Sequence, residues 1–198
     1  MRKVSIPLAV LVLALSLSSP AVADAEGHVN FFLGQKSLDS DDWDPVDKQP
    51  EFGAVMSFGG AEWPVLIAAD VLASGDEEDV SDSFFGPSTL KAGTLEVAFG
   101  ARKIWDVGNT HPYVGGGIAL IGAAAEYDTG VFDVDADDSA IGPWVGGGVF
   151  WRLGSWFNLG FDARWSDAEV DLDFGLGTVA QDVKAGGFHG GVTVGFGW

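Results

Sequence analysis

Ser166 and His189 are the two side chains of this sequence best suited to covalent chemistry. A serine hydroxyl attacks acyl bonds when a histidine takes its proton and an acid orients that histidine. The pair would need to lie on paired strands, on one face and at one depth, which the sequence does not establish. We therefore expect a protein that is not an enzyme, with the Ser–His pair as an open alternative. No motif calls for a cofactor.

Cation binding is the second chemistry to consider. Asp133, Asp135 and Asp137 have the oxygen spacing of the start of a calcium loop. The glycine of such a loop is missing, however, and the twelfth position is Trp144 rather than glutamate, so a calcium-sensor loop is excluded. Loose attraction of divalent cations stays open beside the commoner interpretation, a solvated acidic surface.

Two near-repeats, Pro-Tyr-Val-Gly-Gly-Gly at 112–117 and Pro-Trp-Val-Gly-Gly-Gly at 143–148, suggest phosphate-binding loops at first sight. Neither continues into the Gly-Lys-Ser/Thr that contacts phosphate and metal, and both fall inside expected strands. The glycines are therefore expected to let a narrow sheet bend.

The element that positions these residues best is the last stretch, 188–198. Apolar Val192, Val194, Phe196 and Trp198 alternate there with His189, Thr193 and glycines. Such alternation is typical of a strand whose two faces meet different solvents. A closing strand that ends on an aromatic residue is typical of outer-membrane barrels, where it serves in assembly.

Composition narrows the class further. Residues 1–23 have a basic start, a short apolar run and an Ala-x-Ala site, which predict a cleaved secretory signal peptide and a barrel domain over 24–198. The net charge of −19 excludes nucleic acid as a partner. The absence of cysteine excludes a disulfide scaffold or a thiolate metal site.

Charge is segregated along the chain. Four acidic blocks, 39–51, 70–82, 126–138 and 162–182, alternate with apolar, glycine-rich segments long enough for two strands and a turn. The pattern predicts an all-β, eight-stranded, antiparallel, up-and-down transmembrane β-barrel with four long acidic extracellular loops and both termini in the periplasm. The expected strands are 27–36, 50–59, 64–74, 88–104, 111–127, 140–152, 156–166 and 188–198, and the expected loops are 37–49, 75–87, 128–139 and 167–185.

The expected strands divide the remaining residues between two environments. The inward faces should hold a lumen charge cluster of Asp70, Glu96, Asp162, Arg164 and His189, with Lys91 as a further candidate. Buried charges must be paired, so Arg164 is expected to bind one of these acids and form a polar plug; a gated, cation-preferring path is the alternative. Aromatic girdles are expected at the membrane interfaces from Trp63, Trp105, Tyr113, Trp144, Trp151, Trp156 and Trp165.

Pro112–Gly117, the segment 160–166 and the aromatic C-terminus together resemble the small outer-membrane barrels of the OmpA, OmpX and OmpW type. The resemblance implies a bacterial outer-membrane location, contact with membrane lipid and lipopolysaccharide, and insertion by the barrel-assembly machinery. It implies a structural or surface-interaction role, with a narrow channel for small solutes or hydrophobic compounds as the alternative and a lipid A-modifying enzyme as a third. A secreted lipocalin is the soluble competitor, but its Gly-x-Trp motif is absent near residue 27.

Overall fold

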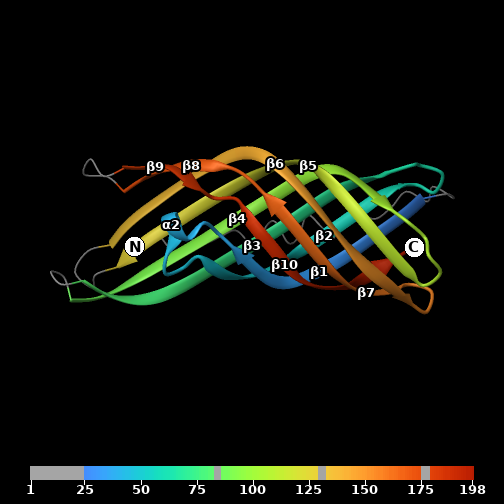
Figure 1. Ribbon diagram of the computed structural model, residues 1–198, viewed down its shortest axis with the longest axis horizontal. Helices are drawn as coiled ribbons and strands as arrows, with labels where there is room; N and C mark the ends of the chain where they lie inside the picture. Colours follow the sequence, from blue (N-terminus) through green and yellow to red (C-terminus); the bar gives the residue numbers. More distant parts are fainter. Residues whose placement is uncertain (1–24, 83–85, 129–132, 175–178) are drawn as a thin grey trace.

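Antiparallel strands make up almost all of the computed structural model, which describes residues 25–82, 86–128, 133–174 and 179–198 (Figure 1). Strand β1 pairs with β2 on one side and with β10 on the other, so the eight-stranded sheet closes into a ring and the predicted fold class is confirmed. The ring contains β1 (Ala25–Ser37), β2 (Lys48–Gly60), β3 (Leu66–Asp82), β4 (Gly86–Ile104), β5 (Thr110–Asp128), β6 (Asp133–Leu153), β7 (Phe157–Ser166) and β10 (Gly187–Gly197).

The two ends of the barrel differ. Short turns join β2 to β3, β4 to β5 and β6 to β7 at one end, where β1 also begins and β10 ends (Figure 1). We call the opposite end of the barrel the outer end. It carries the short helix α2 (Ser40–Trp43) and a separate hairpin of β8 (Glu169–Asp173) and β9 (Val179–Lys184). This is the asymmetry of short turns and long loops that the sequence predicts.

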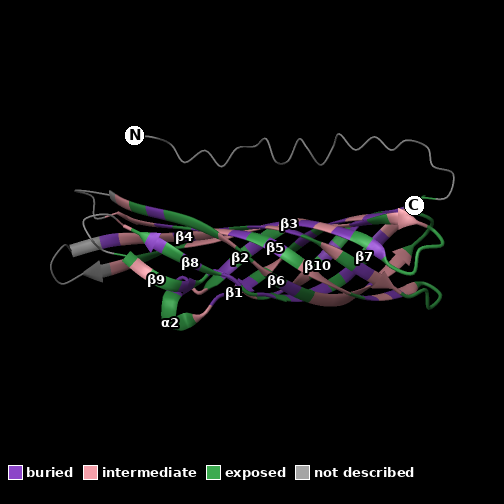
Figure 2. Ribbon diagram, turned by 90° about the horizontal axis from the view of Figure 1, so that it is seen from above, coloured by how far each residue is buried: buried purple, intermediate pink, exposed green. Residues whose placement is uncertain are grey.

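The faces of the strands alternate between exposed apolar and buried side chains (Figure 2). In β7, Phe161 is 56% exposed while its neighbours Asp162 and Gly160 are buried. Residues that share the outward apolar face over the ring are Phe31, Leu33, Phe52, Ile67, Phe99, Ile118, Ile141, Val145, Leu159, Val192 and Val194. The barrel is therefore apolar outside and polar inside, the reverse of a lipocalin.

Three of the predicted loops are wrong in extent. Strand β3 runs on to Asp82 and pairs with β4 from Gly86, so most of the expected loop 75–87 is a hairpin. In the same way β6 begins at Asp133, within the expected loop 128–139, and the expected loop 167–185 contains β8 and β9. Acidic side chains mark solvent, but the backbone hydrogen bonds of a hairpin form in solvent as well, so the charge pattern could not show where pairing stops.

The described residues contain no helix long and apolar enough to cross a membrane. The predicted signal peptide over residues 1–23 lies outside the described residues.

Candidate functional site: a charged cluster inside the barrel

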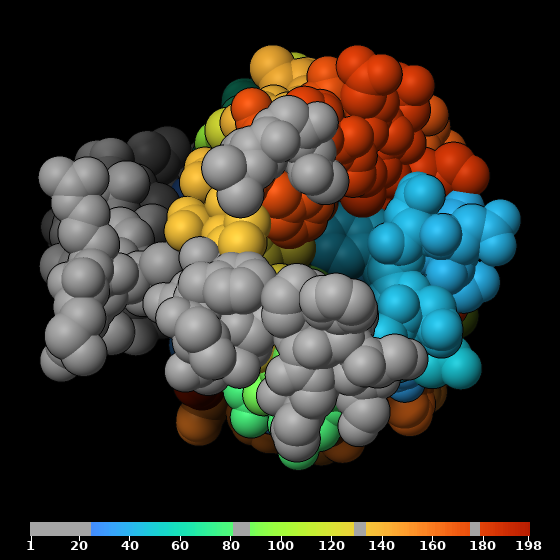
Figure 3. Space-filling model, turned by 90° about the vertical axis from the view of Figure 1, so that its left-hand side faces the viewer, coloured from blue at the N-terminus to red at the C-terminus, as the bar shows by residue number. Residues whose placement is uncertain are grey.

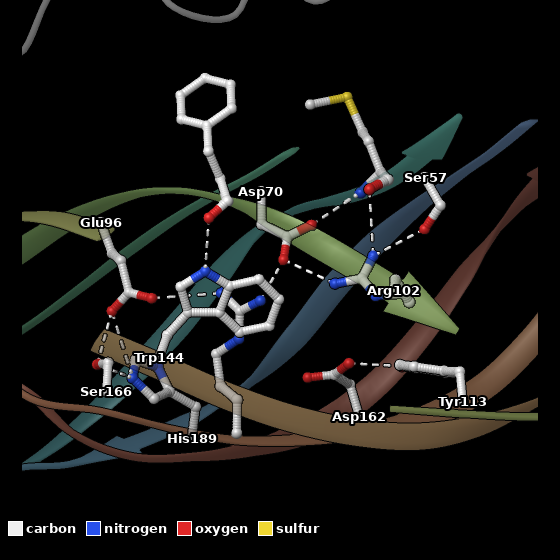
Figure 4. A network of polar contacts seen from close by, with 12 residues as sticks. Ser57, Asp70, Glu96, Arg102, Tyr113, Trp144, Asp162, Ser166 and His189 are labelled. Carbon is white, nitrogen blue, oxygen red and sulfur yellow. Dashed lines mark hydrogen bonds and ion pairs between the residues drawn. The ribbon is translucent and has the colours of Figure 1, made fainter. Parts of the chain in front are cut away.

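Asp70 on β3 is the centre of a network of buried charges (Figure 4). One of its carboxylate oxygens accepts hydrogen bonds from two guanidinium groups, Arg102 Nη2 at 2.8 Å and Arg164 Nη2. Its other oxygen accepts from the backbone N–H of Met56 at 3.0 Å. A buried carboxylate with two cations and a backbone donor is fully satisfied, which is the condition for its burial.

Arg102 links Asp70 to the neighbouring strands, and Arg164 links it to the far side of the lumen. Arg102 on β4 donates to the Ser57 hydroxyl at 2.9 Å and to the Met56 carbonyl at 3.1 Å on β2. Arg164 on β7 donates to Glu96 at 3.3 Å, and its guanidinium lies 4.5 Å from the ring centroid of Trp144. The cluster therefore ties β2, β3, β4 and β7 together across the lumen.

Glu96 connects this network to a serine and a histidine. It accepts a hydrogen bond from the Ser166 hydroxyl at 2.8 Å, and Ser166 lies 3.0 Å from His189 Nε2. The other ring nitrogen of His189 lies 2.8 Å from Glu51, a buried residue on β2. A neighbouring layer joins buried Lys36 to Thr94 at 2.8 Å.

Four of the five predicted cluster residues meet in one network: Asp70, Glu96, Arg164 and His189. Asp162 is also buried, but it accepts from the Tyr113 hydroxyl rather than from Arg164. Lys91 lies on the other face of β4, 44% exposed, and contacts Glu126 at 3.5 Å. The expectation that Lys91 points into the lumen is therefore wrong.

Arg102 and Glu51 are the important members that sequence reasoning missed. Arg102 lies near the end of β4 that leads into a short turn. It lies six residues after Glu96 on the same strand, and an even separation places both on one face. Glu51 stands beside Phe52, which is 63% exposed, so the alternation of β2 was the available signal.

Two predicted interface aromatics point inward instead. Tyr113 and Trp144 are 6% and 3% exposed, and Arg102 lies 5.4 Å from the Tyr113 ring centroid. Glycines make room for both rings, because a Cβ on Gly148 would lie 2.6 Å from the Tyr113 hydroxyl and one on Gly115 would lie 3.2 Å from the Trp144 ring. The two glycine runs lie within β5 and β6, as expected from the sequence.

The other predicted interface aromatics lie on the outside. Trp63, Trp105 and Trp156 are exposed at the short-turn end, and Trp165 is exposed at the far end of β7. Half-buried Trp151 packs edge-on against Phe161, with ring centroids 6.1 Å apart.

The closing strand carries Val194, Phe196 and Trp198 on its outer face. Phe196 stacks on Trp156, with ring centroids 5.2 Å apart, and Trp198 exchanges backbone hydrogen bonds with Gly27 on β1.

The predicted cation site takes a different form from a loop. Asp133, Asp135 and Asp137 lie at alternating positions of β6, where residues on one face are about 7 Å apart along the strand. A strand does not converge its carboxylates on one ion as a loop does. Within the described residues, no group of three or more His, Cys, Asp or Glu side chains is placed to hold a metal ion.

The order Ser166, His189, Glu51 matches a nucleophile, a base and an orienting acid. Their surroundings do not match that chemistry. Ser166, His189 and Glu51 are at most 3% exposed, and a hydroxyl that donates its proton to Glu96 does not present it to His189. The arrangement is better described as one part of the charged network than as a site open to an acyl substrate.

No protein-family profile matches the chain. No curated protein sequence matches it either. Solved structures do: the outer membrane protein OprG from Pseudomonas aeruginosa aligns over 88% of this chain and 95% of its own, at 12% identity and a TM-score of 0.61. Ail, the attachment invasion locus protein of Yersinia pestis, in complex with the heparin analogue sucrose octasulfate, aligns over 88% and 99%, at 13% identity and a TM-score of 0.58.

These likenesses establish the fold: the chain has the small eight-stranded β-barrel fold of these outer-membrane proteins. The resemblance to the OmpA, OmpX and OmpW type is thus confirmed at the level of architecture.

Proposed function

We propose that this protein is a non-catalytic outer-membrane barrel whose lumen is plugged by its charged network and whose working surface is the outer end. The observation that carries the proposal is Asp70 on β3, held at once by Arg102 from the neighbouring strand β4 and by Arg164 from β7 across the lumen. An eight-stranded barrel has an interior just wide enough for side chains to fill, so a cross-lumen ion-pair network occupies the space that a channel would need.

The apolar outward face of the barrel supports placement in a membrane. The outward apolar side chains of the barrel surround a polar interior. Tryptophans at the short-turn end match an interfacial belt, because the indole ring is apolar and its N–H reaches water. The proposal includes export by the predicted signal peptide, insertion by the barrel-assembly machinery and contact with lipopolysaccharide.

The outer end is acidic, whereas a surface that binds a polyanion needs positive charge. The structure of Ail includes a highly sulfated sugar. In the present protein, the parts of β3 and β6 at the outer end carry exposed acidic side chains: Glu77, Glu78, Asp79, Asp135 and Asp137. Like charges repel, so we expect cationic partners, including divalent cations that bridge to lipopolysaccharide phosphates, rather than sulfated glycans.

The proposed orientation, with the outer end outside the cell and the short turns in the periplasm, can be tested directly because the chain contains no cysteine. Glu78→Cys places one thiol on the exposed part of β3 at the outer end, and Asn109→Cys places one in the turn between β4 and β5. A membrane-impermeant maleimide applied to intact cells should label the first variant and leave the second unlabelled until the cells are lysed. Equal labelling of both, or labelling of the second alone, would overturn the proposed orientation.

A further inference from the structure

The outer end contains a second, apolar core that the charged network does not explain. Inward residues of β4 and β5, among them Ala92 and Ala125, face α2 and the β8–β9 hairpin. The hairpin contributes Leu172 and Val183, and α2 contributes Trp43, each of them buried. These segments therefore fold back over the mouth of the barrel as a structured cap.

Between the cap and the barrel wall lies a cavity of about 140 Å³ that is partly open to solvent. Its walls are apolar, with Trp43, Leu90, Ala125, Leu172, Phe174 and Val183 among the lining side chains. Figure 3, which views the outer end, shows the molecule hollowed between the segment around residue 45 and the hairpin. An engineered cavity of about 150 Å³ in another protein binds benzene, so this space accepts a single aromatic ring or a short alkyl chain.

The mouth of the cavity is acidic. Asp42 and Asp44 line it and are exposed to solvent, while most of the walls offer no charge. Lys184, next to Val183 of the wall, is engaged: its Nζ donates to Asp39 at 2.6 Å, and its backbone N–H donates to Asp42 at 3.0 Å. Buried Lys36 is engaged as well, since it donates to Thr94 and to the Ala185 carbonyl. Lys91, next to Leu90 of the wall, contacts Glu126. Carboxylates therefore exceed cations at this opening.

The cap is held by polar contacts that keep the cavity formed. The indole N–H of Trp43 donates to the Lys184 carbonyl at 2.7 Å, which fixes the ring as part of the wall. The Lys184–Asp39 ion pair and the bond to Asp42 join the same two segments. A preformed cavity saves a ligand the cost of ordering its own site.

We propose that this cavity binds a small amphipathic cation, with an aromatic ring or short alkyl chain in the cavity and its ammonium group at Asp42 and Asp44. The site goes beyond the proposed surface role and does not depend on whether the lumen conducts. The volume of the cavity admits one aromatic ring, and its apolar walls favour a ring without polar substituents. The acidic residues at its mouth favour a ligand with a positive head group. A neutral or anionic analogue of the same shape lacks the last of these.

The test uses the full-length protein in zwitterionic lipid nanodiscs and 2-phenylethylammonium as the probe, with empty nanodiscs to subtract partitioning into lipid. Isothermal titration is combined with the NMR shift of the Trp43 indole N–H. Binding should saturate. The neutral 2-phenylethanol should bind about two- to fivefold more weakly, as expected for loss of an exposed ion pair, and the anionic 3-phenylpropionate more weakly still.

Variants separate the walls from the mouth. Ala125→Leu fills the cavity and should weaken binding at least tenfold, whereas Ala124→Leu, the exposed neighbour on the same strand, should not. Asp44→Asn should weaken the cation two- to fivefold and leave the alcohol unchanged; Glu62→Gln at the opposite end is its control. If Ala125→Leu prevents folding, Ala92→Val fills the cavity from β4.

The proposal is overturned if the alcohol or the anion binds as tightly as the cation, if filling the cavity leaves affinity unchanged, or if no saturable binding is seen. A single sharp Trp43 indole resonance that stays protected from hydrogen exchange in each unliganded variant confirms that its bond to the Lys184 carbonyl, and with it the cap, is intact, so loss of binding is not loss of the fold.

Discussion

Removing the Arg164 guanidinium should destabilise the barrel, because it breaks ion pairs to two buried carboxylates, Asp70 and Glu96. Arg164→Met keeps most of the side-chain volume but leaves Glu96, which is 1% exposed, without its cation. Breaking a buried pair by removing one partner costs about 3–5 kcal/mol. Asp70 keeps Arg102 and Glu96 keeps Ser166, so we expect the lower end, about 3 kcal/mol.

The assay is urea unfolding of the refolded barrel in zwitterionic vesicles. Unfolding is monitored by tryptophan fluorescence and by the heat-dependent change in the electrophoretic mobility of the barrel. A double-mutant cycle with Glu96→Gln isolates the pair: removing the second charge should recover about 1–3 kcal/mol relative to the sum of the single changes. Lys103→Met, a half-buried cation with no place in the network, is the matched control. The reasoning fails if Arg164→Met behaves like this control, or if the cycle is additive.

Three further outcomes are expected. Phe161→Arg places a cation on the apolar outer face at a cost of about 2–4 kcal/mol and should lower membrane yield, whereas Glu78→Arg at the outer end should not; equal yields would mean that the faces are reversed. Phe196→Ala with Trp198→Ala removes the stack on Trp156 and should reduce the heat-modifiable form in outer membranes, and a normal level would sink the closing-strand hypothesis. The hydrogen bond from Lys184 lowers the pKa of Asp39 below its ordinary 3.8, so the contact between α2 and β9 is complete above that pH and is lost as pH falls through the lowered pKa. An NMR titration of the Trp43 indole should therefore show a transition below pH 3.8 that Asp39→Asn abolishes.

The architecture could be predicted from the sequence because the barrel meets two solvents. Along β7, Leu159, Phe161 and Trp165 face outward between buried Asp162 and Arg164, and this alternation fixes the face of each residue without any knowledge of the partner strand. Four members of the charged network could be assigned to the lumen for the same reason.

The assignment of side chains to the inner or outer face failed in strands where the residues on both faces are apolar or glycine. In β5, Ile118 and Leu120 point outward while Tyr113 and Ile121 point inward, so alternation carries no polarity that distinguishes the faces. Trp144 on β6 has the same difficulty beside exposed Val145. The sequence predicted that Arg164 pairs with Asp70, Glu96 or Asp162, and the structure pairs it with the first two. The choice among them could not be predicted, because it depends on the stagger between distant strands: Arg164 and Asp70 are 94 residues apart in sequence.

The proposal of a plugged lumen is tested most directly by single-channel recording of the refolded protein in a planar bilayer, with insertion verified by protease protection. The ion-pair network across the lumen predicts no discrete conductance steps for the native chain, and openings only after Arg164→Ala removes the side chain that spans the interior. Cation-selective steps in the native protein would contradict the plugged lumen and make the barrel a narrow channel.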